Sequence, residues 1–169
     1  VYMDAAGRDY PPKLDAASQL PPGYGAWFVR DRTLYFIQGV WTAAELDAHS
    51  ITVLEALVFV FVELAFPPLF PEVSHLFELT DNTGAQAVAE TFTPHAPALQ
   101  RISAKRAAVL SAARIFTRSG RVTSADNRWA DALSRGEVAR VLREAATLGL
   151  YTQRIDLTPD MRDTAWLLP

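Results

Sequence analysis

Runs of aromatic and β-branched residues, broken by turn-forming residues, fill much of the first forty positions and are typical of β-strands. VYMDA predicts a short strand over residues 1–5, followed by a loop at 7–25 that carries several prolines and glycines. The runs GAWFVRD and TLYFIQGVW meet at Asp31-Arg32 and predict a hairpin. Three consecutive strands are therefore expected to open the fold.

The most apolar stretch, ITVLEALVFVFVELAF, covers residues 51–66 and ends at Pro67-Pro68. It includes Glu55 and Glu63, and it is too short and too charged for a membrane span, which needs about 20 apolar residues. We therefore expect a buried helix. The polar segment TAAELDAHS leads into this helix, and Ser50 or Thr52 is available as its N-cap.

The second half of the chain alternates between the hydrophobic pattern of strands and that of helices. SHLFELTD predicts a fourth strand that ends in Asp81, before a small helix, and residues 97–117 predict a longer helix that stops near Gly120. RVTSA predicts a fifth short strand, and residues 129–148 predict a helix interrupted at Gly136. This order favours an α/β domain over residues 1–150, with 151–169 as a C-terminal tail or linker that either packs back or extends.

Composition narrows the chemistry. The chain has 169 residues, half of them apolar, which suits one domain with a sizeable core. It has no cysteine, so disulfides, zinc–thiolate sites and thiol nucleophiles are excluded. Residues 101–145 carry ten basic and four acidic side chains (+6), so the net charge of −3 leaves −9 for the rest. This asymmetry is compatible with a polyanion on one face beside metal-binding carboxylates, or with ordinary solvated helix surfaces.

Four acids occupy notable places in the predicted elements. Asp4 lies inside the first strand, Glu55 in the apolar helix, Asp81 at the end of the fourth strand, and Asp131 early in the last helix. Each alone could be an edge-strand, first-turn or capping acid. If the four converge, their repulsion requires a cation, and hard oxygen ligands without cysteine or histidine indicate Mg²⁺ or Mn²⁺.

The strings VYMDAAG, ITVLEAL, ELTDNTGA and NRWADALSRG resemble the four active-site blocks of the ribonuclease H domain of retroelement reverse transcriptases. They follow in the family's order over residues 1–136, and ADALSRG is the most specific. WTAAELDAHSITVLEAL is similar to the version in DIRS-like retroelements. The resemblance implies a ribonuclease H-like fold, with a five-stranded mixed sheet of three antiparallel strands and then two parallel ones, flanked by helices.

The resemblance also implies an endoribonuclease that cleaves the RNA strand of RNA–DNA hybrids by two-metal-ion hydrolysis. Asp4, Glu55, Asp81 and Asp131 would then be both the catalytic residues and the ligands of two Mg²⁺ ions, for which Mn²⁺ could substitute. The implied partners are the hybrid and the polymerase domain of the same polyprotein, inside the cell and without a membrane. Two alternatives are a catalytically inactive relative that binds nucleic acid or a polymerase partner, and a DNA nuclease or resolvase.

The sequence departs from the family's pattern in one respect. Many relatives carry a histidine in the loop before the last acid, whereas RSGRVTSADNRW has none, so product release is expected to be slower or assisted in another way. Asp126 in this loop is a rival to Asp131 as the fourth ligand. His49, two residues before the apolar helix, is expected to support local hydrogen bonding rather than chemistry.

Substrate contacts are expected on both sides of the metal site. Short polar residues at helix starts suit recognition of the 2′-hydroxyl group of RNA, and a glycine lets the backbone approach nucleic acid closely. Basic side chains on the 97–117 helix would bind phosphates. Capping and a solvated helix face are the structural alternatives, and Asn127 could instead orient the last helix. The candidate substrate-binding residues are Gly7, Asn82, Thr83, Arg101, Lys105, Arg106 and Asn127.

Overall fold

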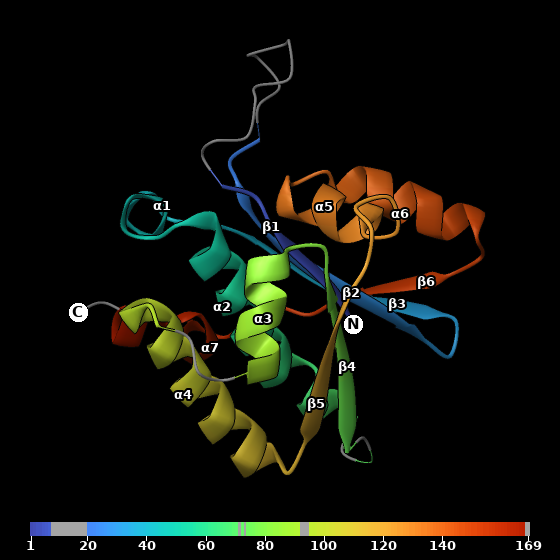
Figure 1. Cartoon of the computed structure of the whole chain (residues 1–169). Helices are drawn as coiled ribbons and strands as arrows, with labels where there is room; N and C mark the ends of the chain where they lie inside the picture. The colour runs from blue at the N-terminus through green and yellow to red at the C-terminus, as the bar shows by residue number, and fades with distance from the viewer. Residues whose placement is uncertain (8–19, 71, 73, 92–94, 168–169) are drawn as a thin grey trace.

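A mixed β-sheet of six strands forms the centre of the computed structural model, which describes residues 1–7, 20–70, 72, 74–91 and 95–167 (Figure 1). The strands lie in the order β5-β4-β1-β2-β3-β6. Their bounds are β1 Tyr2–Ala5, β2 Gly23–Arg30, β3 Thr33–Val40, β4 His75–Thr80, β5 Phe116–Arg121 and β6 Tyr151–Arg154.

Strand direction follows the expected pattern of three antiparallel strands and then two parallel ones. β2 pairs antiparallel with β1 and with β3, β4 pairs parallel with β1, and β5 pairs parallel with β4. The α/β mixed sheet is confirmed, but the prediction of five strands is wrong, because β6 adds a parallel partner to β3. All four β6 residues are exposed, so no hydrophobic alternation marks this strand in the sequence.

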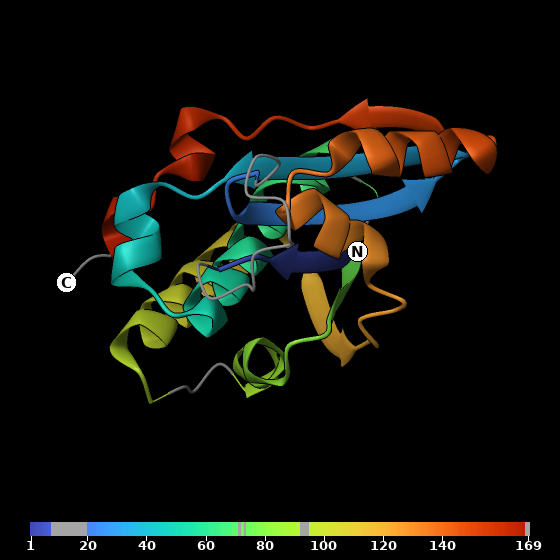
Figure 2. The ribbon, with the colours of Figure 1, turned by 90° about the horizontal axis from the view of Figure 1, so that it is seen from above.

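Helices cover both faces of the sheet. α2, α3 and α4 pack on one face, and α5 lies against β1, β2 and β3 on the other, where α6 packs on α5 and β6. Figure 2 looks down on the layer that contains α5 and α6. The helices are α1 Ala43–Ala48, α2 Ile51–Ala65, α3 Thr83–Thr91, α4 Pro97–Ala113, α5 Arg128–Ser134, α6 Val138–Thr147 and α7 Pro159–Arg162, with short 3-10 turns at η2 Pro67–Leu69 and η3 Ala165–Leu167.

Several predicted boundaries move. The predicted 97–117 helix ends at Ala113, where Arg114 adopts a left-handed φ of 55°, and β5 therefore starts before the predicted RVTSA strand. The predicted interruption at Gly136 is confirmed, because this glycine has a φ of 76° between α5 and α6. The polar segment before α2 forms a separate helix, α1, which Thr42 caps, whereas Ser50 makes no side-chain cap bond to α2.

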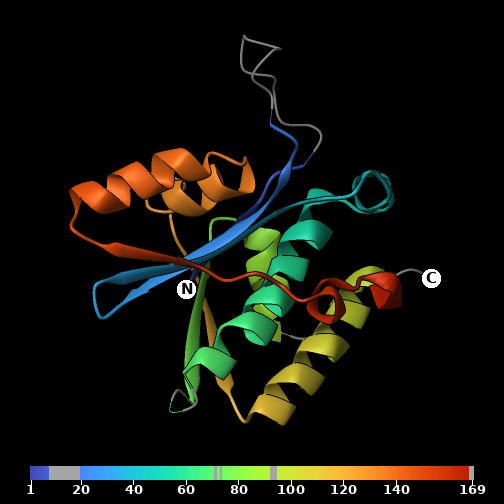
Figure 3. The ribbon, with the colours of Figure 1, turned by 180° about the vertical axis from the view of Figure 1, so that it is seen from behind.

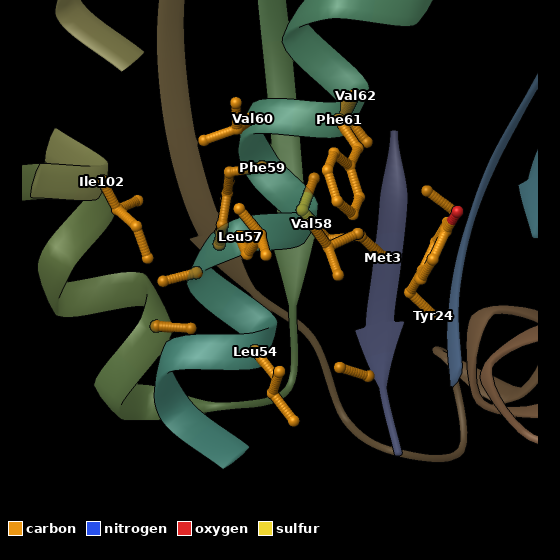
Figure 4. Close-up of a cluster of buried hydrophobic side chains, with 14 of the residues drawn as sticks. Met3, Tyr24, Leu54, Leu57, Val58, Phe59, Val60, Phe61, Val62 and Ile102 are labelled. Atoms are coloured by element: carbon orange, nitrogen blue, oxygen red, sulfur yellow. The ribbon is translucent and has the colours of Figure 1, made fainter. Parts of the chain in front are cut away.

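The core forms around α2, as its apolar sequence predicts. Twelve of its fifteen residues are buried, and Leu57, Val58 and Phe61 lie with Met3 and Tyr24 of the sheet in one cluster (Figure 4). The stretch Ile51–Leu69 is apolar and long enough to span a membrane by length and composition, but 72% of it is buried inside the protein. α2 is therefore accounted for as a core helix.

The C-terminal residues pack back onto the domain. After β6 the chain crosses α2 and reaches α4 through α7 and η3, as Figure 3 shows from behind. Leu167 is fully buried in the main core cluster. Of the two expected alternatives for residues 151–169, packing back or extending, the described part of the segment packs back onto the core.

Candidate metal centre

Three of the four predicted acids come together at one edge of the sheet. Asp4 in β1, Glu55 in α2 and Asp81 directly after β4 each present a carboxylate oxygen, and these oxygens all lie within 4.8 Å of one another. We call these three residues the carboxylate cluster. They line a cleft of about 650 Å³, whose wall also contains Asp131. The predicted convergence is thus confirmed for three acids, and the fourth faces the same cleft.

Strand direction explains this meeting. β1 and β4 are parallel neighbours, paired at Tyr2 and Leu79, so their carboxyl ends reach the same edge of the sheet. Asp4 lies near the end of β1, and Asp81 immediately follows β4. Glu55 joins them from α2, which packs across β1. Residues far apart in the sequence therefore share one site because of sheet topology.

Neighbouring side chains fix the orientation of Glu55. Thr80 donates a hydrogen bond to Glu55 Oε2 at 3.2 Å, and Asn82 Nδ2 donates to Glu55 Oε1 at 3.0 Å. The Asn82 side-chain oxygen accepts from the backbone N–H groups of Gly84 and Ala85 at 2.8 and 3.0 Å, as a helix cap does. The predicted substrate residue Asn82 thus caps α3 and holds Glu55 at the same time.

Asp81 and Asp4 are held from the loop after β5 and from α5. Ser124 Oγ donates to Asp81 Oδ2 at 2.7 Å, and Asn127 Nδ2 donates to Asp81 Oδ1 at 3.3 Å and to the Met3 carbonyl oxygen at 3.0 Å. Ser134 Oγ donates to Asp4 Oδ2 at 2.6 Å. Asn127 is fully buried, so it orients Asp81 rather than presenting a surface for substrate.

Asp131 stands apart from the carboxylate cluster. Its Oδ1 accepts hydrogen bonds from Arg135, one turn later in the chain, through Nε at 2.7 Å and through Nη2. Both residues line the cleft. The rival Asp126 lies exposed in the loop, where it accepts a bond from Thr123 at 2.7 Å, and it is not part of the cleft wall. The geometry favours Asp131 over Asp126 as the fourth acid.

The cleft is electrostatically unfavourable for so many carboxylates. Burial raises the pKa of Asp4 to about 7, and the charges of Asp81 and Asp131 add to this, against the hydrogen bond from Ser134. Burial, and then the charge of Asp4, raise the pKa of Glu55 to about 8. A bound cation would relieve this repulsion and favour the ionised forms. The donor set of hard oxygens fits Mg²⁺ or Mn²⁺.

The predicted substrate residues separate into two groups. Gly7 and Asn82 line the cleft, and Thr83 is exposed at the start of α3. Arg101 and Lys105 do not line the cleft but hold the C-terminal segment: Arg101 Nε donates to the Leu167 carbonyl oxygen at 3.1 Å, and Lys105 Nζ lies 5.7 Å from the ring centre of Trp166.

The prediction that Arg106 binds a substrate phosphate is wrong. Its side chain is 1% exposed and lies between Glu63 of α2 and Glu78 of β4, with nitrogen–oxygen distances of 2.7 to 2.8 Å. It therefore cannot serve as a surface contact for phosphate, because its guanidinium is buried and pairs with two buried acids. Glu78 points from the sheet toward α4, and its burial is tolerated because Arg106 of α4 supplies a cation next to it.

Some residues of the site were missed from the sequence. Ser124, Ser134 and Arg135 contact the acids directly, although only the last two belong to the recognised ADALSRG block. The half-buried His49 lines the cleft, and burial lowers its pKa. Its backbone N–H ends α1 by donating to the Glu45 carbonyl oxygen.

Comparison with protein-family models, with curated proteins and with solved structures finds no match to this chain.

Proposed function

We propose that this protein is a ribonuclease H-like nuclease that hydrolyses the RNA strand of RNA–DNA hybrids with two divalent cations. The observation that carries the proposal is the meeting of Asp4, Glu55 and Asp81 within 4.8 Å, with Asp131 on the same cleft. The order of the strands, three antiparallel and then two parallel, also supports the ribonuclease H-like fold that the sequence motifs imply.

In this proposal the carboxylates hold the cations, which would bind the scissile phosphate, lower the pKa of an attacking water and stabilise the leaving oxygen. The chain's own part is positioning. Thr80 and Asn82 fix Glu55, Ser134 fixes Asp4, and Ser124 fixes Asp81. Because the four acids alone would repel a polyanion, substrate binding in the cleft depends on the cations, and no histidine is needed as a base.

Cleavage of three labelled duplexes tests the proposal. RNA–DNA hybrid, duplex RNA and duplex DNA are each incubated with the protein in Mg²⁺, Mn²⁺ or EDTA. We expect cleavage of the RNA strand of the hybrid alone, with either cation and not in EDTA. Asp81→Asn should lower the rate by about 100-fold or more, because it removes a ligand oxygen and a charge.

Asp126→Asn is the matched control, since this acid lies exposed in the adjacent loop and should leave the rate within about twofold. A hybrid that is bound but never cut would instead identify an inactive nucleic-acid-binding relative. Cleavage of duplex DNA would identify a DNA nuclease. Because the polymerase domain of the same polyprotein is a proposed partner, the assay is also run with that domain added.

A further inference from the structure

Within the part of the chain that the structure describes, one face of the sheet leaves side chains of β4 and β5 exposed. Glu78 and Thr80 point to α4 and α2, so the alternate residues of β4 point to the opposite face. In the parallel register these alternate residues stand beside β5 residues that point the same way. α5 and α6 pack on β1, β2, β3 and β6 on this side. The outward residues are His75, Phe77 and Leu79 of β4, and Phe116, Arg118 and Gly120 of β5; we call them the β4–β5 face.

Two aromatic rings on this face are unusually accessible. Phe77 is 54% exposed and Phe116 is 70% exposed. The His75 ring stacks on Phe116, with centroids 5.6 Å apart. A Cβ atom at Gly120 would lie 3.2 Å from the ring of Phe77, so the glycine leaves room for this ring beside β5. The two rings are thus exposed on a strand scaffold rather than packed into the core.

Charge accompanies the rings. Arg118 is exposed on this face, and Arg114 and Arg128 are exposed in the segments that flank β5, against one exposed acid, Asp126, whereas Arg121 pairs with Thr80 and points to the other face. None of the six residues of the β4–β5 face is acidic. Aromatic rings on which bases stack, beside arginines that pair with phosphates, are the combination that recognises single-stranded nucleic acid. A purely apolar protein interface does not need this positive charge.

We propose that the β4–β5 face binds a single-stranded segment of nucleic acid, with bases on Phe77 and Phe116 and phosphates on Arg118 and its neighbours. β5 leads into the loop whose Ser124 holds Asp81, so the chain runs from this face toward the cleft. A strand on this face would run toward the carboxylate cluster. The inference does not require hydrolysis, because neither ring nor arginine belongs to that cluster.

Fluorescence anisotropy of a labelled oligothymidylate, about 15 nucleotides long, measures this binding in EDTA at low salt. We expect the double variant Phe77→Ala/Phe116→Ala to bind at least tenfold more weakly, because each stacked base contributes about that factor. Arg118→Gln should weaken binding several-fold and reduce its salt dependence. Tyr151→Ala is the matched control: it removes a 73% exposed aromatic from the opposite edge strand and should change nothing.

Equal affinity of the wild type and the double variant would overturn the proposal and leave the rings as a protein-docking surface. Absence of wild-type binding at about 50 mM salt would also overturn it. The side chains of Phe77, Phe116 and Arg118 are exposed, so the variants should fold, and circular dichroism checks this. Because the binding is measured in EDTA, where no metal-dependent cleavage takes place, the result separates failure of this inference from failure of the proposed nuclease activity.

Discussion

The carboxylates of the cluster are held in place by neutral donors rather than by cations. Ser134 bonds to Asp4, Thr80 and Asn82 to Glu55, and Ser124 to Asp81. These bonds orient the oxygens but neutralise no charge. The site is therefore preorganised and electrostatically strained, which is the condition under which a divalent cation binds tightly.

This strain makes stability depend on pH and metal. The folded-state pKa values of about 7 for Asp4 and about 8 for Glu55 exceed the ordinary values of 3.8 and 4.5, so the folded protein holds more protons than the unfolded chain between those limits. The free energy of unfolding without metal should fall as pH rises from about 4 to 8. Thermal unfolding at pH 5 and pH 8 measures this.

Mg²⁺ should raise the melting temperature more at pH 8 than at pH 5, because protons compete for the same oxygens. Asp4→Asn should stabilise the metal-free protein at pH 8 by roughly 1–3 kcal/mol and abolish most of the Mg²⁺ effect. Asp126→Asn, which removes an exposed charge, should leave both unchanged. A melting temperature that rises with pH in EDTA would contradict this account of the cluster.

Arg106 poses the opposite electrostatic problem, since it is a buried cation between two buried acids. Arg106→Met should lower the free energy of unfolding by about 3–5 kcal/mol at pH 8, because it leaves Glu63 and Glu78 without compensation. Burial raises the pKa of both acids, so the loss should shrink as pH falls and the acids become protonated. Urea unfolding at pH 8 and pH 5 measures this loss, with Arg140→Met, which removes two surface ion pairs, to Glu137 and Glu144, as the control.

The sequence predicts the acids of the site better than it predicts the residues that hydrogen-bond or pair with acids. Asp81 could be located because a strand end in an α/β sheet is where ligands gather. Arg106 was misjudged because helical periodicity alone does not reveal that a buried acid, Glu78, lies opposite it on another element. Ser124 and Asn127 depend on how the loop after β5 folds back to β1 and Asp81, which no local pattern encodes.

At the scale of elements, the position of α5 decides whether Asp131 and Ser134 reach the cleft. α5 packs closely on β2 at Gly25, where a Cβ atom would lie 2.3 Å from Leu133 Cβ and 2.8 Å from the backbone nitrogen of Ser134. Only a residue without a side chain allows this contact. The sequence predicts the helix and its break at Gly136. It does not predict how closely α5 packs on β2 at Gly25.

Gly25→Ala should therefore displace α5 from the sheet. We expect a loss of roughly 1–3 kcal/mol in unfolding free energy, because the clash is with a helix and not with a mobile side chain. The bond between Ser134 and Asp4 should also loosen, which weakens Mg²⁺ binding in a calorimetric titration. Gly120→Ala, which meets only the side chains of Leu79 and Phe77, should leave metal affinity intact.

At the scale of the whole molecule, the C-terminal segment closes the domain over the wall of the cleft. Arg162 in α7 donates to both carboxylate oxygens of Glu45 in α1, at 2.5 and 2.7 Å. Its guanidinium lies 5.3 to 5.4 Å from the ring centres of Tyr24, Trp41 and Phe61. Glu45 in turn completes the capping box of α1 with Thr42. The sequence left open whether these residues pack back or extend, because α7 has only four residues and no periodic pattern.

Arg162→Ala should release this segment and loosen α1, whose Leu46 and C-terminal His49 line the cleft. We expect a loss of roughly 2–4 kcal/mol in unfolding free energy, because the variant leaves Glu45 buried without its cation. Faster amide exchange in both α1 and β6 would show that α1 and the C-terminal segment open together. Arg154→Ala, which removes an exposed pair with Asp156, should cost under about 1 kcal/mol.

The same contact predicts an acid limit for the fold. Burial alone would raise the pKa of Glu45, but hydrogen bonds from Arg162 and Thr42 outweigh it and lower the value to about 2. Because the folded value lies below the ordinary 4.5, the stabilisation is complete above that pH and is lost as pH falls toward 2. Glu45→Gln should remove this acid sensitivity while keeping the cap on α1. If the variant and the wild type lost stability equally below pH 4, the ion pair between Arg162 and Glu45 would not hold the C-terminal segment to the domain.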